Sequence, residues 1–371
     1  MKIRDFYYFD CNATLPVRKE ALKAYLEGEK FAFANPSSSY PPGKVAKEYL
    51  ENSRKTILNK LNFDGDLIFT SSATESNHIA LLSYAQNQKI ERIVMSKVEH
   101  PGVYELRNVL RGMGKDVCEV SVDKNCLIDL NQLQSFLKEK RSAVALIFAH
   151  NETGVIQNFA EIAKICLRYN ALLHLDCVQA FSKVELPFKQ YFPDTLSIAS
   201  HKIGGPKGVA ALAFKKRVKL YPMLYGGGQE KGLRSSTESV PLIYSFAKVS
   251  DSIDIEKYKT VETLRNYFEE KLSSLLKIEI YGKNALRLPN TSFFSLRDFD
   301  GREIQKTLSK INICVGTGSA CHASSSILPK VILEMGYKDV QFPLRVSFSY
   351  KTKKTDVLYL LKKLGEVTKM V

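Results

Sequence analysis

One stretch of sequence decides the fold class: ALLHLDCVQA, residues 171–180. Its apolar run Ala171–Leu175 is short, Asp176 follows at once, and Gln179 comes three positions later. A short apolar run bounded by polar residues is typical of a buried strand. An acid at the C-terminal end of such a strand in a doubly wound sheet points into the ligand crevice. From this stretch alone, a cap on the turn after the strand explains Asp176 equally well.

Similar apolar runs occur on both sides of this stretch. Between about Lys44 and Phe214 they alternate with segments in which apolar residues recur every three or four positions. The runs predict strands at Leu67–Thr70, Arg92–Met95, Ala143–Ala149, Leu172–Asp176, Leu196–Ala199 and Val209–Phe214, and the segments predict helices at Glu75–Tyr84, Val103–Gly112 and Ala160–Tyr169. This alternation predicts an α/β fold, with a mostly parallel central sheet and helices on both faces.

The pattern changes after about Ser250. A long charged helix is predicted at Glu256–Leu276, and further strands at Ile278–Tyr281, Thr291–Leu296, Ile313–Val315 and Leu344–Ser349. We therefore expect a large domain of residues 15–250 and a small α+β domain made of residues 1–14 and 251–371. Because no flexible linker separates the two, we expect them to pack closely, and the crevice between them is the first place to look for a site.

Composition excludes several classes of protein. With 371 residues, 44% of them hydrophobic and 25% charged, the chain is neither disordered nor collagen-like. Its apolar runs are far shorter than the roughly 20 residues that a membrane span needs. Its seven cysteines include no CxxC pair, which favours reduced thiols in the cytoplasm and argues against a structural metal.

The charge balance leaves one alternative from another class. The chain has 54 Lys and Arg against 39 Asp and Glu, for a formal net charge of +15. A nucleic-acid-binding module would have such a charge. The basic residues are spread along the chain, however, without the aromatic interleaving of such modules. We therefore expect a generally basic surface and no direct binding of nucleic acid.

Three further stretches could carry chemistry. SSATE, residues 71–75, opens a predicted helix directly after a strand, so its N–H groups could hold a phosphate or form an ordinary N-cap. Lys202 lies between a strand and a Gly-Gly-Pro turn, where it is either an amine nucleophile or a turn lysine. Cys321 lies in the small-residue loop GTGSACH, residues 316–322, as a candidate thiolate. The possible phosphate site at residues 71–75 and the amine of Lys202, together with Asp176 and Arg345, are the groups that a pyridoxal phosphate enzyme needs.

The sequence resembles the cysteine desulfurases, in the fold-type I group of pyridoxal phosphate enzymes, and its cysteine loop resembles that of their long-loop group. The matching stretches follow the family's order along nearly the whole chain. They are residues 8–14 (YFDCNAT), 35–38 (NPSS), 70–77 (TSSATESN), 99–101 (EHP), 151–154 (NETG), 176–180 (DCVQA), 201–202 (HK), 226–230 (GGGQE), 233–238 (LRSSTE) and 318–321 (GSAC).

The resemblance implies a role for each matching position in binding the cofactor. Lys202 would form the Schiff base with pyridoxal phosphate, Asp176 would pair with the ring nitrogen, and Gln179 would reach the ring hydroxyl. His100 would stack on the ring and assist proton transfer. The implied cofactor-binding residues are Ala73, Thr74, Asn151, Asp176, Gln179, Ser200, His201, Lys202 and Thr237, the last reaching over from a neighbouring subunit of a homodimer.

The resemblance also implies the reaction. Asn35, Asn151 and Arg345 would bind the substrate, and Cys321 would attack its sulfur. L-cysteine would become L-alanine, and the persulfide on Cys321 would pass its sulfur to an acceptor protein of iron–sulfur assembly or of tRNA thiolation. Small residues around Cys321 predict a mobile loop.

One alternative remains within the same superfamily. His322, directly after Cys321, resembles the selenocysteine lyase branch. The spacing from Cys321 to Gly336 favours the long-loop desulfurases instead.

Overall fold

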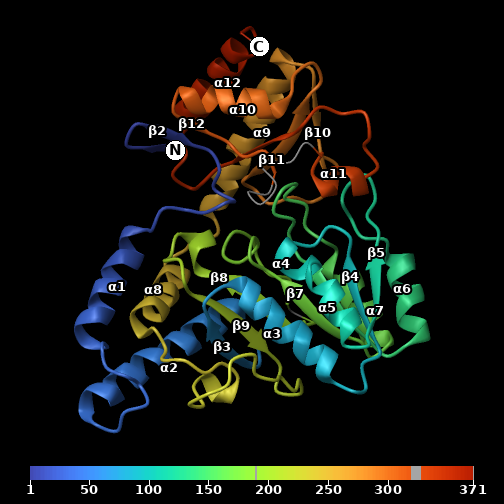
Figure 1. The fold of residues 1–371 in the computed structure, drawn as a ribbon. Helices are drawn as coiled ribbons and strands as arrows, with labels where there is room; N and C mark the ends of the chain where they lie inside the picture. The colour runs from blue at the N-terminus through green and yellow to red at the C-terminus, as the bar shows by residue number, and fades with distance from the viewer. Residues whose placement is uncertain (189, 319–326, 371) are drawn as a thin grey trace.

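A computed structural model describes residues 1–188, 190–318 and 327–370. Figure 1 shows a large sheet flanked by helices in the lower part of the molecule and a smaller group of strands and helices above it. Both ends of the chain lie in the upper part (Figure 1). Among the described residues, no helix is long and apolar enough to cross a membrane.

The large sheet has seven strands in the order β3-β9-β8-β7-β6-β4-β5. Only β9 runs antiparallel to its neighbours, so the predicted mostly parallel sheet is confirmed. The bounds are β3 (Asp66–Thr70), β4 (Arg92–Ser96), β5 (Asp116–Val120), β6 (Ser142–Ile147), β7 (Leu172–Asp176), β8 (Thr195–Ala199) and β9 (Ala210–Phe214).

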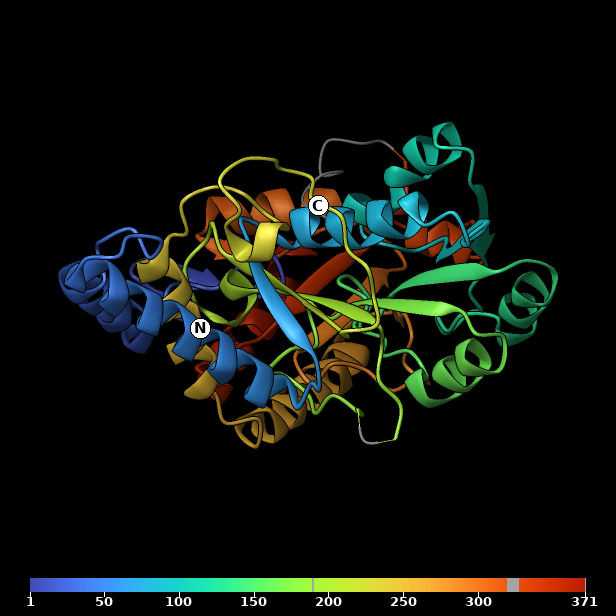
Figure 2. The same ribbon diagram turned by 90° about the horizontal axis from the view of Figure 1, so that it is seen from below.

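Helices cover both faces of this sheet, because successive residues of a strand point to opposite sides. Ile93 and Ala143 belong to one apolar cluster, with side chains of α3 and α5, while Val94 and Val144 belong to another, with side chains of α2, α6, α7 and α8. Figure 2 shows the strands between these layers. The bounds are α1 (Lys19–Phe31), α2 (Pro41–Leu61), α3 (Ala73–Gln86), α4 (Pro101–Tyr104), α5 (Leu106–Gly112), α6 (Leu130–Glu139), α7 (Phe159–Arg168) and α8 (Val240–Asp251).

Two small sheets lie in the upper part of the molecule. One joins β1 (Lys2–Ile3) and β2 (Phe6–Tyr8) to β12 (Ile313–Cys314), and the other has the order β10-β11-β13. The remaining elements are α9 (Lys257–Leu275), β10 (Ile278–Ile280), β11 (Thr291–Leu296), α10 (Gly301–Lys310), α11 (Lys330–Glu334), β13 (Leu344–Ser347) and α12 (Lys354–Val367). We propose to keep the division made from the sequence, with residues 1–14 and 251–371 as the small domain, because β2 pairs with β12.

Candidate active site

Two neighbouring strands bring the predicted acid and the predicted amine to one edge of the sheet. β7 ends at Asp176, and β8 runs parallel to it into a 3-10 helix, η1 (Ser200–Ile203), that carries Lys202. Because parallel strands end on the same side, both residues lie at the carboxyl edge, where ligands bind in such sheets.

Asp176 is buried and its carboxylate is held by two donors. The side-chain amide of Asn77 on α3 donates to Oδ2 over 2.9 Å, and the N–H of Val178 donates to Oδ1 over 3.0 Å. The strand-end carboxylate is therefore held in one orientation.

A chain of buried polar groups fixes the orientation of Asn77. Since its amide nitrogen donates to Asp176, its Oδ1 accepts from Nε2 of His174, 3.0 Å away. Nδ1 of His174 then accepts from the hydroxyl of Thr195 over 2.8 Å, and Thr195 accepts from Tyr84 over 2.8 Å. Burial lowers the pKa of His174 to about 3, so the imidazole is neutral.

The Lys202 amine is half-buried and points to the N-terminal segment. Its Nζ donates to the main-chain oxygens of Asn12 and Ala13, over 2.8 and 2.9 Å. The same Asn12 oxygen accepts from the side-chain amide of Gln179 over 2.9 Å. Lys202 and Gln179 thus meet at one carbonyl group.

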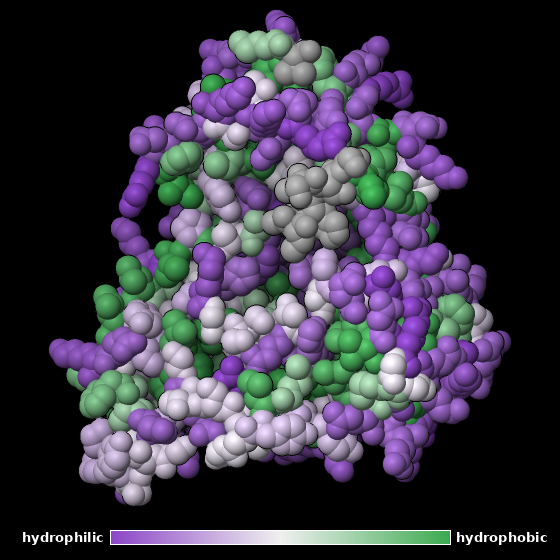
Figure 3. Space-filling view, viewed as in Figure 1, coloured by the Kyte–Doolittle hydropathy of each residue, from purple (hydrophilic) through white to green (hydrophobic). Residues whose placement is uncertain are grey.

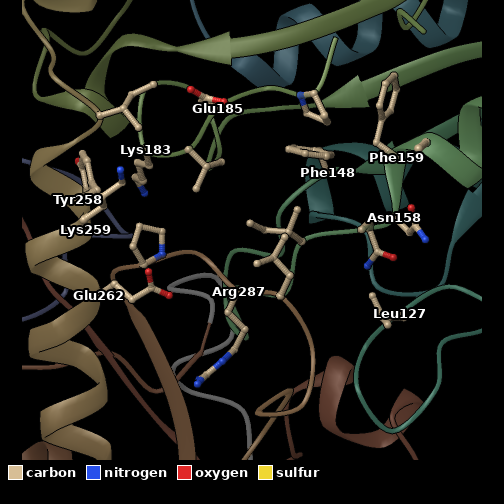
Figure 4. A pocket seen from close by; sticks show the side chains of 18 of the residues that line it. Leu127, Phe148, Asn158, Phe159, Lys183, Glu185, Tyr258, Lys259, Glu262 and Arg287 are labelled. Carbon is tan, nitrogen blue, oxygen red and sulfur yellow. The ribbon is translucent and has the colours of Figure 1, made fainter. Parts of the chain in front are cut away.

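A second lysine, Lys183, donates hydrogen bonds to both Gln179 and Asn12. Lys183 is buried, and its Nζ donates to Oε1 of Gln179 over 2.7 Å and to Oδ1 of Asn12 over 3.3 Å. Figure 4 shows Lys183 beside Tyr258 and Lys259 of α9, in the wall of a cavity of about 750 Å³.

His100 and Thr74 lie together near the start of α3. A Cβ built on Gly102 would come within 2.9 Å of the Thr74 hydroxyl and 3.2 Å of Nδ1 of His100. Burial lowers the pKa of His100, Asp176 opposes that shift and Lys202 adds to it. The imidazole is therefore close enough to the acid and the amine to respond to their charges.

Three more predicted cofactor ligands occupy different surroundings. His201 lies beside the Thr14 hydroxyl, 3.1 Å away, and burial together with Lys202 lowers its pKa to about 4. Ser200 is fully buried, and its hydroxyl lies against Gly205 with no hydrogen-bond partner among the described residues. Thr237 is exposed and lines a cavity of about 220 Å³ with Ser71 and Arg234.

Arg345 lies on β13, at the boundary between the small domain and the large sheet. It is buried, and its guanidinium donates to Asp10 over 2.7 Å and to the main-chain oxygen of Asn151 over 3.0 Å. Two of the predicted substrate ligands, Asn151 and Arg345, are therefore in contact. Gly316 packs against the same guanidinium, since a Cβ there would approach its Nη2 to 3.2 Å.

Asn35 does not join them within one chain. It is exposed in the connection between α1 and α2, where its side chain accepts from the N–H of Ser37 over 2.9 Å. Figures 1 and 2 place α1 and α2 at the edge of the large domain, away from the strands that carry Asp176 and Lys202.

Cys321 and Ser324–Ser326, with which we predicted a nucleophile on a mobile loop, lie outside the described residues. The residues that flank them, Thr317 and Ile327, line a cavity of about 330 Å³ together with Asn151 and Glu99. The chain thus enters and leaves the undescribed segment beside Asn151, a predicted substrate ligand.

Sequence reasoning missed the role of Asn12, Asn77, His174 and Lys183. Asn12 and Asn77 lie inside stretches that match the family, but side-chain amides carry no signal of their own. His174 alternates with leucines in a buried strand, and a polar residue in that position predicts an internal hydrogen bond. Lys183 lies close to Phe181 and Val184 in the sequence, and a lysine in such an apolar stretch could have indicated a buried, hydrogen-bonded amine.

The arrangement fits pyridoxal phosphate, because each part of the cofactor finds a side chain or backbone group of matching chemistry. A carboxylate held in place by two donors suits a protonated ring nitrogen, and an amine at the same edge of the sheet suits an aldehyde. The N-terminus of α3, with Thr74, His100 and the space that Gly102 leaves, suits a phosphate.

Known proteins are similar over nearly the whole chain. The family described as "Aminotransferase class-V" matches residues 7–360. "Cysteine desulfurase IscS 1" of Archaeoglobus fulgidus is 35% identical over 337 residues, covering 89% of this chain and 88% of the relative. "Cysteine desulfurase IscS" of Dictyoglomus turgidum is 33% identical over 368 residues, covering 95% and 92%.

The fold is similar to a solved structure as well. The NifS-like protein from Rickettsia africae superimposes with a TM-score of 0.90 at 30% identity and covers 98% of this chain and 99% of its own. The chain belongs to the class-V aminotransferase family and, within it, to the cysteine desulfurases.

Proposed function

We propose that this protein is a pyridoxal phosphate-dependent cysteine desulfurase that converts L-cysteine to L-alanine and collects the sulfur on Cys321. The observation that carries the proposal is the Asp176 carboxylate, fixed by Asn77 at the end of β7 and next to the strand that leads to Lys202. The cysteine desulfurase relatives support the same activity. Nothing in them favours the selenocysteine lyase alternative.

The cofactor, when bound, supplies an electron sink for the carbanion that forms on the substrate. Asp176 favours a protonated ring nitrogen, because a fixed carboxylate stabilises a neighbouring positive charge. Lys202 would supply the amine that holds the cofactor, and the same amine would serve as the base that takes a proton from the substrate.

His100 is suited to hold a proton on one defined atom. Its Nδ1 accepts the N–H of Gly102 over 3.1 Å, and its lowered pKa keeps the ring neutral. The proton therefore sits on Nε2, the nitrogen turned away from Gly102. From there the imidazole can donate to a group on the substrate.

Arg345 suits the substrate carboxylate, because guanidinium binds carboxylates in a two-pronged geometry. Its Nη atoms contact Asp10 and Asn151, while its Nε has no hydrogen-bond partner among the described residues. We infer that the carboxylate of cysteine joins or displaces the Asp10 contact.

Transfer of sulfur from the substrate to the enzyme needs one thiolate and no further oxidant or reductant. The Cys321 thiolate forms the S–S bond with its own electron pair, and the pair of the broken C–S bond stays on carbon. That carbon takes up a proton and becomes the methyl group of alanine. The outer sulfur of the Cys321 persulfide then passes to an acceptor protein, of iron–sulfur assembly or of tRNA thiolation.

We propose that the protein acts as a homodimer in the cytoplasm. Apolar side chains are exposed on α1 and the connection after it: Leu22, Leu26, Phe31, Phe33 and Tyr40. Figure 3 shows the apolar surface over α1. A partner subunit that covers this apolar surface could bring its own Asn35 to the active site of the first subunit. Thr237 of the first subunit would in turn reach the active site of the partner. The six described cysteines are free, as expected in a reducing compartment.

The experiment is a comparison of two thiol variants. Protein loaded with pyridoxal phosphate is expected to release sulfide and alanine from L-cysteine in the presence of a reductant. Cys321→Ala is expected to abolish sulfide release, whereas Cys118→Ala, which removes a half-buried thiol on β5, keeps it. Wild-type turnover by Cys321→Ala would contradict the nucleophile assignment.

A further inference from the structure

Lys183 is a buried lysine whose two hydrogen-bond acceptors are side-chain amide oxygens. The residue is 1% exposed, and its Nζ lies 2.7 Å from Oε1 of Gln179 and 3.3 Å from Oδ1 of Asn12. A buried amine is costly without acceptors. The reaction described above assigns this lysine no part, so its place beside Gln179 requires an explanation.

The contact determines which way the Gln179 amide faces. An ammonium group has donors and no acceptor, so the amide must turn its oxygen toward Lys183 and its NH₂ away from it. Nε2 of Gln179 accordingly donates to the Asn12 oxygen over 2.9 Å. That oxygen also accepts from Lys202 over 2.8 Å, so the NH₂ group faces the amine that holds the cofactor.

We propose that Lys183 is a positioning residue, which fixes the Gln179 amide so that its NH₂ group is available to the ring hydroxyl of the cofactor. The inference rests on the proposed function, because the cofactor gives Gln179 its role. Without Lys183 the amide could rotate by half a turn and offer its oxygen instead, which would repel a ring oxygen.

Both protonation states of Lys183 can make these contacts. Burial, followed by the charge of Lys202, lowers the pKa of Lys183 to about 7. The ammonium and the neutral amine each have at least two N–H bonds, one for each amide oxygen. Only the ammonium lacks an acceptor, so the amide is fixed most strictly below neutral pH.

The cavity of about 750 Å³ shows what the lysine stem also does. Lys183 lines this cavity together with Tyr258 and Lys259 (Figure 4). Its stem therefore forms part of the cavity wall. A test must keep that volume filled, which Lys183→Met does, since methionine is also long and unbranched.

The readout is the visible absorption band of the bound cofactor, titrated with pH in purified protein without substrate. Lys183→Met removes both the donor that orients Gln179 and a positive charge near Lys202, so the midpoint of the titration is expected to rise by roughly half a unit to one unit. Lys215→Met is the matched control, because Lys215 contacts Phe192 rather than the site. It should leave the midpoint unchanged.

A double variant distinguishes an effect of Lys183 through the Gln179 amide from an effect of the Lys183 charge alone. Gln179→Leu is expected to raise the midpoint, and Lys183→Met added to it should produce less than half of the rise that it causes in the wild-type background. Lys183→Gln, which keeps an N–H donor and does not overfill the site, is expected to restore part of the wild-type midpoint. It also provides the readout if the methionine variant does not fold.

Three outcomes would overturn the inference: an unchanged midpoint in folded Lys183→Met, an equal rise with and without Gln179, or a Lys183→Gln midpoint no closer to wild type than that of Gln179→Leu. A wild-type protein that binds no pyridoxal phosphate would refute the proposed function instead.

Discussion

The side-chain amide of Asn77 donates a 2.9 Å hydrogen bond to the carboxylate of Asp176, joining the first helix after β3 to the end of β7. Replacing Asn77 by leucine removes this donor at similar volume. We expect a roughly 10- to 150-fold loss of cysteine turnover, because a hydrogen bond to a charged group contributes about 1.5–3 kcal/mol. Steady-state kinetics with saturating cofactor will measure it. Asn59→Leu, on the exposed side of α2, is the control, and an equal loss there would exclude a specific role for Asn77.

Substrate binding is expected to require a guanidinium at position 345, and an ammonium should not replace it. Lysine keeps the charge but cannot reproduce the planar fork that contacts Asp10 and Asn151. We predict that Arg345→Lys raises KM for L-cysteine by roughly 10- to 100-fold. The cofactor's visible band should be kept, since Arg345 is proposed to bind the substrate. An unchanged KM would remove Arg345 from the substrate site.

The location of Asn35 predicts complementation between subunits. Asn35→Ala and Lys202→Ala are each expected to be inactive, since one loses a substrate ligand and the other the amine. Mixed dimers place both intact residues in one of their two sites, so random mixing after co-expression should give roughly a quarter of wild-type activity. Size-exclusion chromatography will report the oligomeric state. No recovery in verified mixed dimers would mean that Asn35 serves its own subunit or none.

Two buried histidines predict how stability depends on pH. Burial lowers the pKa values of His150 and His174 to about 3, whereas unfolding exposes imidazoles that titrate near 6.5. The unfolded chain therefore binds more protons in acid, so the stabilisation is complete above pH 6.5 and is lost as pH falls toward 3.

Each of these histidines should lower the free energy of unfolding by about 1.4 kcal/mol per pH unit below pH 6. Urea titrations at pH 6 and pH 5 will measure the slope. His174→Gln is expected to flatten it by the contribution of one histidine, because the glutamine amide does not titrate. A variant slope equal to wild type would show that His174 is protonated in the folded protein.

The sequence predicted the strands that are buried on both faces, and also the edge strand β3, but it missed the strand at the other edge of the sheet. β7 has the expected bounds, and β4, β6 and β8 differ by one or two residues, because continuous apolar runs mark strands between two helical layers. β5 was not predicted, since only one of its five residues is buried and it lies at the sheet edge. The predicted helix Val103–Gly112 is two helices, which are separated at Glu105.

The site shows a similar division. Motif residues such as Asp176 and Lys202 could be named from the sequence, because they follow strands whose ends must converge. The supports Asn77, His174, Asn12 and Lys183 could not, because most of their partners are distant in sequence. Lys183 contacts Gln179, four positions before it, but it also contacts Asn12, 171 positions away. The bond from Asn12 to Thr291 spans 279 positions, and no local pattern encodes such a contact.

The most direct measurement is to find which lysine holds the cofactor. Protein incubated with pyridoxal phosphate, reduced with borohydride and digested should carry the added mass on the peptide that contains Lys202. Lys183 is the informative competitor, because it too is buried near the site and has a pKa of about 7. We expect modification of Lys202 and none of Lys183. Modification at Lys183, or of no lysine in protein that remains folded, would contradict it.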